Sequence, residues 1–203
     1  MLRRETVTPD TLELLKSLMQ KDYLQQFVLV GGTALALQIG HRRSIDLDFF
    51  TIHDFNTPTL LPNLEKDYTI QIEDQLPQTL ICSVNGIKVD FIRFQYAFLH
   101  PIVTLEGIRM LSVEDIAPMK LDAITGRGSK KDFYDLYFLL QQYDLKTLFS
   151  FYTNTYPHQT TFHVARSLAY FDDAEAMPDP EVMDKKVTWS KVKKAIVKEI
   201  QKL

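Results

Sequence analysis

The sequence predicts an α+β fold, in which a mixed sheet with flanking helices is followed by a helical C-terminal module. The first half alternates short apolar, β-rich runs with short helical stretches. From Ser112 onward the apolar residues recur at the period of a helix. The 203 residues are 45% hydrophobic and 24% charged, which is enough for one domain or two small ones. We therefore expect an α/β core over residues 1–112 and a helical module over residues 113–203, packed on that core.

The core is expected to combine apolar strands with short helices. The predicted strands span residues 27–30, 45–50, 68–72, 80–84 and 88–94, and the predicted helices span residues 9–20, 33–39 and 58–67. Asn85-Gly86, between the last two strands, is a strong signal for a tight hairpin turn.

The C-terminal module is expected to be entirely helical. Helices are predicted near residues 113–125, 130–142, 145–153, 159–170 and 190–202, with an acidic loop over residues 171–184. Residues 184–203 hold seven lysines against Asp184 and Glu199, a net charge of +5. Such an end faces solvent in most proteins, but it can also contact an acidic partner or an RNA backbone.

Composition limits the function classes and the compartment. The net charge of −3 gives no global basic field, which argues against a protein that only binds nucleic acid. Cys82 is the single cysteine, so no disulfide can form within the chain, as expected in a reducing compartment. No run reaches the roughly 18 apolar residues that span a bilayer. The N-terminus turns polar after Arg4, unlike a signal peptide. We expect a cytoplasmic protein without membrane contact.

The predicted strand at residues 45–50 carries two acids. Because successive side chains of a strand point to opposite faces, Asp46 and Asp48 should lie on one face while Ile45, Leu47 and Phe49 enter the core. Aspartate is rare in strands, and two like charges this close repel each other. A divalent cation would remove that repulsion, and oxygen ligands favour Mg²⁺ or Mn²⁺.

A third acid would complete a two-metal site. Asp90 lies in another predicted strand, and it joins the cluster if that strand is next to the first. Two metals about 3.5–4 Å apart can activate an attacking oxygen and stabilise a leaving pyrophosphate. The alternative is structural, with these aspartates at strand ends, bound to water or arginine.

Gly31-Gly32 follows the first predicted strand. Glycines let backbone N–H groups approach a phosphate closely, and the start of the next helix favours anions. The Thr33 hydroxyl either donates to a phosphate oxygen or caps that helix.

These motifs, taken together, resemble a known family. Residues 30–37 (VGGTALAL) and 40–50 (GHRRSIDLDFF) look like the AbiEii/AbiGii-type toxin nucleotidyltransferases of the polymerase-β-like nucleotidyltransferase superfamily. Residues 119–124 (MKLDAI), Arg127, and residues 131–137 (KDFYDLY) and 167–174 (SLAYFDDA) are similar to later motifs. The superfamily pattern has Gly-Gly or Gly-Ser, a short helix, a paired acid and a third acid. Where many members have Gly-Ser, this chain has Gly-Gly.

The resemblance implies a nucleotidyltransferase-type sheet and an activity. The enzyme would transfer a nucleoside monophosphate from an NTP to an acceptor with Mg²⁺ or Mn²⁺. For several relatives the acceptor is the 3′ end of tRNA, which halts growth. The protein would then be the toxin of a toxin–antitoxin or abortive-infection system, with an antitoxin protein as a partner.

The resemblance also suggests further site residues. Lys120 shares the stripe of Ile116 and Ile124, and it either reaches the NTP phosphates or extends its ammonium into water. Asp132 either pairs with Lys120 or the acceptor, or closes a capping box with Ser129. The five scattered histidines show no zinc spacing.

Arg42 and Arg43 precede the acidic strand. One of them, with Arg43 as the candidate ligand for the nucleotide, is expected to contact phosphate or RNA. The alternative is that they balance the charge of the aspartates.

Two other functions remain open from the sequence. The first is nucleotidyl transfer to a hydroxyl of a small molecule such as an antibiotic, for which an acidic pocket would suit. The second is a non-catalytic protein that engages a partner, which the intact acids argue against.

Overall fold

The computed structural model describes residues 1–203, which form two compact units. The first unit contains Met1–Ile39 and Ser44–Ser112, and the second contains Gly40–Arg43 and Val113–Leu203. The chain therefore leaves the first unit for four residues, returns to it, and leaves it again after Ser112. The predicted boundary at residue 112 did not include this short excursion.

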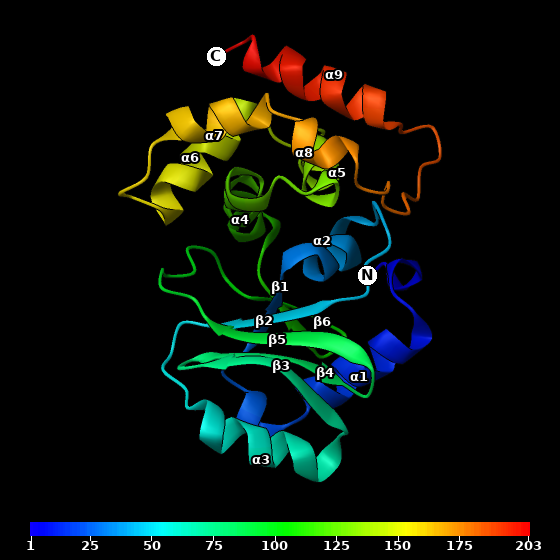
Figure 1. Cartoon of the computed structure of the whole chain (residues 1–203), viewed down its shortest axis with the longest axis vertical. Coiled ribbons are helices and arrows are strands. Elements are labelled where there is room, and N and C mark those ends of the chain that lie inside the picture. Colours follow the sequence, from blue (N-terminus) through cyan, green and yellow to red (C-terminus); the bar gives the residue numbers. More distant parts are fainter. The chain divides into compact units, whose positions relative to one another are not determined.

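A seven-stranded mixed sheet forms the first unit (Figure 1). The strands are β1 Val28–Val30, β2 Leu47–Thr51, β3 Ile70–Leu76, β4 Thr79–Val84, β5 Ile87–Arg93, β6 Val103–Leu105 and β7 Ile108–Met110. Their order is β3-β4-β5-β2-β1-β7-β6. The pairs β2–β5 and β1–β7 are parallel, whereas the other pairs are antiparallel. The predicted fold class, α+β with a mixed sheet, is confirmed.

Three helices flank the sheet: α1 Pro9–Met19, α2 Gly31–Ile39 and α3 Thr57–Asp67. Thr8 caps α1, since its hydroxyl accepts a hydrogen bond from the Thr11 amide at 3.1 Å. Helix α2 packs against β1 and β2 on one face of the sheet, and α3 lies on the opposite face (Figure 1). This arrangement places the start of α2 directly after the end of β1.

Aromatic side chains form the centre of this unit. Phe49 and Phe91 stack with their ring centroids 5.4 Å apart, and Phe27 meets Phe91 edge-on at 5.3 Å. Leu47 is fully buried as well. The odd-numbered residues of β2 thus anchor the strand in the core, and its even-numbered residues lie on the other face.

The prediction for the acidic strand was wrong at its start. Strand β2 begins at Leu47, and the Ile45 side chain is 61% exposed instead of buried. The residues before the strand bond elsewhere: the Ser44 amide donates to the carbonyl oxygen of Thr6 at 2.8 Å. Because these backbone groups are engaged outside the sheet, the strand cannot extend back to residue 45.

Turn chemistry explains two hairpins. The Asn85-Gly86 turn is confirmed between β4 and β5, with φ angles of 51° and 84° that fit a type I′ turn. Strands β6 and β7 were not predicted. They are three residues each, too short for a period-2 pattern, and are joined at Glu106-Gly107, where both φ angles are positive.

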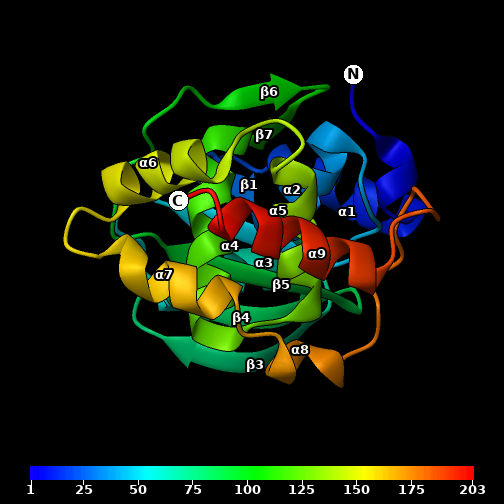
Figure 2. The same ribbon diagram turned by 90° about the horizontal axis from the view of Figure 1, so that it is seen from above.

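The second unit is helical (Figure 2). Its helices are α4 Val113–Arg127, α5 Lys130–Leu139, α6 Leu145–Thr155, α7 Thr161–Leu168, α8 Asp172–Glu175 and α9 Trp189–Ile200. Helix α4 contacts α5, α6 and α7, and α9 packs on α5 and α7. Trp189 stacks on Tyr134 at 5.9 Å and so ties α9 to α5. The short helix α8 lies within the stretch that was predicted to be an acidic loop.

Every helix of the structure is too short or too polar to cross a membrane.

Candidate active site

Strand pairing brings two of the predicted acids together. Strands β2 and β5 are parallel neighbours, and Asp48 lies directly opposite Asp90 in their register. Asp46 lies one residue before β2. Asp48 and Asp90 meet because two strands remote in sequence are adjacent in the sheet, and the charge of Asp46 also acts on Asp90.

Asp90 is the most constrained of the three. Its side chain is only 15% exposed, and its buried Oδ1 atom has no hydrogen-bond partner. Burial, together with the negative charges of Asp48 and Asp46, raises the pKa of Asp90 to about 6. Lys88 lies 4.0 Å from the other carboxylate oxygen and opposes this shift only in part. The neighbouring acids and burial thus outweigh Lys88 in their effect on the pKa of Asp90.

Gly31 approaches the same carboxylates. Its φ angle is +67°, and a Cβ atom there would lie 2.3 Å from Oδ2 of Asp48. Only glycine fits this position without displacing Asp48. The predicted helix began at residue 33, whereas Gly31 and Gly32 form the first turn of α2. The start of a helix favours anions, so this turn suits a phosphate.

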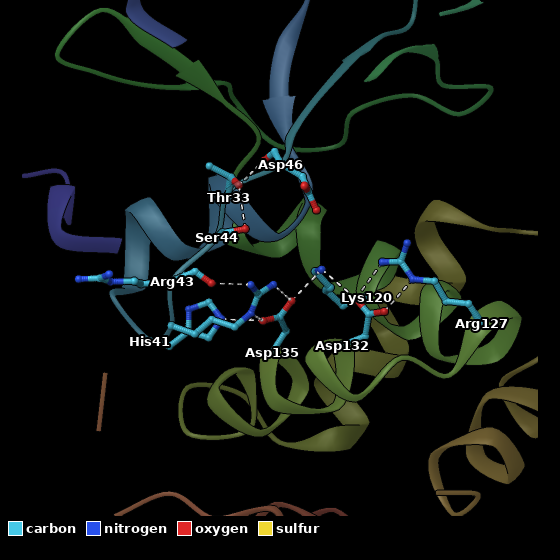
Figure 3. Close-up of polar contacts among 10 residues, drawn as sticks. Thr33, His41, Arg43, Ser44, Asp46, Lys120, Arg127, Asp132 and Asp135 are labelled. Atoms are coloured by element: carbon cyan, nitrogen blue, oxygen red, sulfur yellow. Dashed lines mark hydrogen bonds and ion pairs between the residues drawn. The ribbon is translucent and has the colours of Figure 1, made fainter. Parts of the chain in front are cut away.

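Thr33 connects the glycine turn to the acids. Its side chain is fully buried, and its hydroxyl lies 2.8 Å from Oγ of Ser44 and donates to the backbone carbonyl of Asp46 (Figure 3). The hydroxyl was predicted to meet a phosphate or to cap the helix. In the structure, the hydroxyl instead fixes the backbone just before β2.

The acids of this unit fit a divalent cation by their chemistry. In the structure, no three side chains of His, Cys, Asp or Glu are gathered closely enough to enclose a metal ion. However, Asp48 and Asp90 are in register, and one carboxylate oxygen is buried without a partner. Carboxylate oxygens that lack sufficient counter-charge are the donors that Mg²⁺ and Mn²⁺ prefer.

A second set of predicted residues lies within the helical unit. Lys120 is 4% exposed, and its Nζ atom lies 3.0 Å from Oδ1 of Asp132 and 2.7 Å from Oδ2 of Asp135 (Figure 3). The alternative in which its ammonium extends into water is therefore wrong. Burial alone would lower the pKa of Lys120, but the charges of Asp135 and Asp132 outweigh it and raise the pKa. Lys120 thus remains a cation.

Asp132 belongs to this cluster and does not close a capping box. Ser129 precedes α5 but makes no side-chain capping bond. Asp132 is fully buried and accepts hydrogen bonds from Arg127, with Nε at 2.8 Å and Nη2 at 3.1 Å. Of the alternatives for Asp132, pairing with Lys120 is confirmed.

Asp135 and His41 are central to the cluster, but the sequence analysis assigned neither a role. The fully buried Asp135 carboxylate accepts two hydrogen bonds from Arg42, with Nε at 2.5 Å and Nη2 at 2.9 Å. Nε2 of His41 lies 2.7 Å from the same carboxylate. The spacing of Asp132 and Asp135, one turn apart on α5, was the available signal.

The two arginines have separate environments. Arg42 is buried and binds Asp135 within the helical unit. The alternative in the sequence analysis had been that Arg42 balances the charge of Asp46 and Asp48. Arg43 is about half exposed, and its Nε atom lies 3.5 Å from Glu181. Among the two, Arg43 is the residue whose side chain solvent can reach.

Comparisons with known proteins identify the family of the chain. The family model described as nucleotidyl transferase AbiEii toxin, type IV toxin–antitoxin system, matches residues 13–100 and 83–202. An uncharacterised Aquifex aeolicus protein is 38% identical over 168 residues, which cover 80% of this chain and 82% of that protein.

Solved structures share the fold. The MenT4 nucleotidyltransferase toxin of Mycobacterium tuberculosis has a TM-score of 0.58 at 15% identity, covering 94% of this chain and 84% of that chain. JHP933 of Helicobacter pylori has a TM-score of 0.54 at 19% identity, covering 97% of this chain and 94% of that chain.

Proposed function

Since the chain belongs to the AbiEii family of nucleotidyl transferase toxins and is a nucleotidyltransferase, we propose that it transfers a nucleoside monophosphate from an NTP to RNA, with divalent metal ions. The observation that carries this proposal is the register of β2 and β5, which places Asp48 opposite Asp90 next to the glycine turn of α2. Acids beside a phosphate-binding turn are what metal-assisted nucleotidyl transfer requires.

Each acid receives a role in this proposal. Asp46 and Asp48 would hold both metal ions, and Asp90 would hold the ion next to the acceptor hydroxyl. When bound, Mg²⁺ or Mn²⁺ supplies positive charge that favours ionisation of the hydroxyl and stabilises the leaving pyrophosphate. The raised pKa of Asp90 supports this assignment, because the carboxylate is partly buried among other acids and its Oδ1 atom has no hydrogen-bond partner.

Several groups are candidates for contacts with phosphate. The first-turn amides of Gly31, Gly32 and Thr33 would bind phosphate oxygens of the NTP. Lys120, kept protonated by Asp132 and Asp135, remains a candidate phosphate ligand on the family resemblance, and Asp132 would orient it. Arg43 is assigned to a phosphate of the nucleotide or the RNA, because its guanidinium is accessible.

The acceptor that we propose is the 3′ end of tRNA. Addition of nucleotides there would block aminoacylation and stop growth, which fits a toxin of a toxin–antitoxin or abortive-infection system with an antitoxin partner. The overall charge of −3 is compatible, because RNA contacts need only a local basic surface.

The test is incubation of the protein with each α-labelled NTP, Mg²⁺ and total bacterial RNA, followed by a denaturing gel. We expect label in a tRNA-sized band. Asp48→Asn should lower the labelling rate by more than about a hundredfold, because it changes a proposed metal ligand, and changes to residues that only support such ligands already cost about tenfold to a hundredfold. Asp74→Asn, the same change on the exposed strand β3, is the matched control and should retain activity. Full activity in Asp48→Asn would refute the site.

Metal dependence is tested in the same assay. EDTA should abolish the label, and either Mg²⁺ or Mn²⁺ should restore it. Labelling of a small hydroxylated acceptor, with no labelled RNA under any NTP, would replace RNA as the acceptor.

A further inference from the structure

The helical unit contains a cavity that the proposed chemistry does not use. Its volume is about 580 Å³, in the range of cavities that hold a small ligand. It lies between the C-terminal end of α4, with Gly128 that follows it, and residues of α7 and of the segment after α7. Its lining consists of Ile124, Thr125, Gly126, Arg127, Gly128, His163, Arg166, Ser167, Ala169, Tyr170 and Asp173.

Basic groups dominate the charge of this cavity. Arg166 is exposed at the end of α7, and 58% of the Arg127 side chain is accessible. His163 adds a ring nitrogen, and Asp173 is the one carboxylate of the lining. The Arg166 guanidinium can bind a pair of phosphate oxygens. Arg127 donates Nε and Nη2 to Asp132 and adds positive charge from its accessible part, so the cavity suits an anion that carries phosphate.

The cavity also offers an aromatic surface. Tyr170 is 52% exposed, although a large aromatic side chain usually packs inside, and its hydroxyl lies 3.5 Å from Oδ1 of Asp173. This contact involves the hydroxyl end of the ring, and about half of the residue is open to solvent. An accessible tyrosine beside arginines is the combination with which proteins stack unpaired bases and bind the adjoining phosphate.

Glycines border the cavity on both sides of Arg127. A Cβ atom at Gly126 would meet nothing within 4 Å, and Gly128 has a φ angle of +53°. The chain therefore presents bare backbone here, which lets a ligand approach closely. A flat nucleotide base can use such an unobstructed approach.

We propose that this cavity binds a single-stranded nucleotide of the RNA acceptor. Tyr170 stacks on the base, and Arg166 with Arg127 binds the phosphate. This inference rests on the proposed function and names how the acceptor is held. Arg127 also bonds Asp132, which bonds Lys120, so the cavity belongs to the same side-chain network as the catalytic lysine.

RNA binding alone is the first test, without NTP or metal. The probe is a fluorescently labelled ten-nucleotide single-stranded RNA, followed by anisotropy with the full chain. We expect Arg166→Glu and Tyr170→Ala to weaken binding about tenfold each. Tyr170→Phe keeps the ring and should bind like the wild type. Arg166→Ala should also lower the slope of log affinity against log salt by about 1.

A matched control separates binding at this cavity from non-specific electrostatic attraction of RNA to the protein surface. Lys146→Glu makes the same charge change at an exposed position on α6, outside the cavity lining. It should change the affinity less than twofold. An equal loss in Lys146→Glu and Arg166→Glu would overturn the proposal, because the contact would then be non-specific.

Kinetics distinguish failure of this inference from failure of the proposed function. Arg166→Glu and Tyr170→Ala should raise the KM for RNA while the KM for the NTP stays unchanged. If the wild type labels RNA and both variants show a normal KM for RNA, the cavity proposal is wrong while the function stands. A raised KM for the NTP alone would assign the cavity to the nucleotide, and would also overturn it. An RNA that binds by anisotropy but is never labelled would refute the function instead.

Discussion

The contact between Gly31 and Asp48 allows a test of the site at the level of a single atom. Ala at residue 31 would add a Cβ atom 2.3 Å from Oδ2 of Asp48, on a backbone with a φ angle of +67°. We expect Gly31→Ala to lower the free energy of unfolding by more than the about 1–2 kcal/mol that a left-handed backbone costs. Because Asp48 must move, the activation free energy of transfer should rise by at least as much as the free energy of unfolding falls. Urea unfolding and the gel assay measure the two effects.

Gly86 provides the matched control for that substitution. It also has a positive φ, +84°, but a Cβ atom there would meet nothing within 4 Å. Gly86→Ala should therefore show the backbone cost alone, with normal transfer. If both variants transferred nucleotide equally well, the Asp48 carboxylate would not need the position that the structure gives it.

Asp135 makes the stability of the protein depend on pH. Burial alone would raise the pKa of its carboxyl group, but the charges of Arg42 and Lys120 hold that pKa well below 3.8. A carboxyl group whose pKa is lower in the folded state contributes stability above its ordinary pKa, and loses it as the pH falls through the folded value. We expect Asp135→Asn to cost about 3–5 kcal/mol at pH 7, since it leaves two buried cations poorly compensated.

The difference between wild type and Asp135→Asn should shrink below pH 3.8, because the wild type then loses the contribution of the ion pair. Urea unfolding at pH 7 and pH 3 measures this. An equal difference at both values would mean that packing, and not charge, accounts for the loss.

At the scale of elements, Thr33 connects the helix α2 to the strand β2. Its hydroxyl donates to the carbonyl of Asp46, so one buried hydrogen bond sets where the acidic segment begins. Thr33→Val removes the hydroxyl at nearly the same volume, and should cost about 1–3 kcal/mol because the carbonyl loses its partner. We expect transfer to decrease as well. Thr33→Ser keeps the hydroxyl and should keep activity.

The kinetics of the two Thr33 variants decide between positioning and direct phosphate binding. Loss of positioning should lower kcat with little change in the KM for the NTP. A raised KM for the NTP with normal kcat would instead support the original prediction, in which the hydroxyl contacts a phosphate.

Local patterns explain which elements could be predicted. The alternation of Leu47, Asp48 and Phe49 predicted both the strand and its acidic face, and Asn85-Gly86 predicted its turn. Ile45 was wrongly predicted to lie in the strand. The backbone next to it forms hydrogen bonds outside the sheet, such as that of the Ser44 amide, and no sequence pattern reveals such bonds. Strands β6 and β7 are shorter than any period that could reveal them.

The side-chain cluster of the helical unit could be predicted only in part. Lys120 and Asp132 lie 12 residues apart, and their pairing was among the alternatives considered. His41 and Arg42 lie 94 and 93 residues from Asp135, so no local periodicity connects them. Their role depends on the tertiary fold, which brings them next to Asp135. In the sequence alone, Asp135 looks like any polar residue of an amphipathic helix.

For the whole molecule, the path of the chain has an energetic consequence. Gly40–Arg43 groups with the helical unit although residues on both sides belong to the first unit. Within the helical unit, Arg42 and Val182 form an antiparallel bridge. The Arg43 amide donates to the carbonyl of Glu181 at 2.8 Å, and the Met183 amide donates to the carbonyl of His41 at 2.9 Å. The helical unit is therefore completed by a segment that comes from the middle of the other unit's sequence.

The isolated fragment of residues 113–203 tests this dependence. It lacks Arg42 and His41, so the buried carboxylate of Asp135 would keep only Lys120. Loss of one partner of a buried ion pair costs about 3–5 kcal/mol, against about 5–15 kcal/mol for a typical domain. We expect the fragment to unfold at a much lower temperature than the full chain, or without a cooperative transition, as measured by circular dichroism. Addition of a peptide of residues 38–45 should raise its Tm, and the same peptide with Arg42→Ala should not. A fragment that melted like the full chain would show that the four-residue segment is dispensable for the fold of the helices.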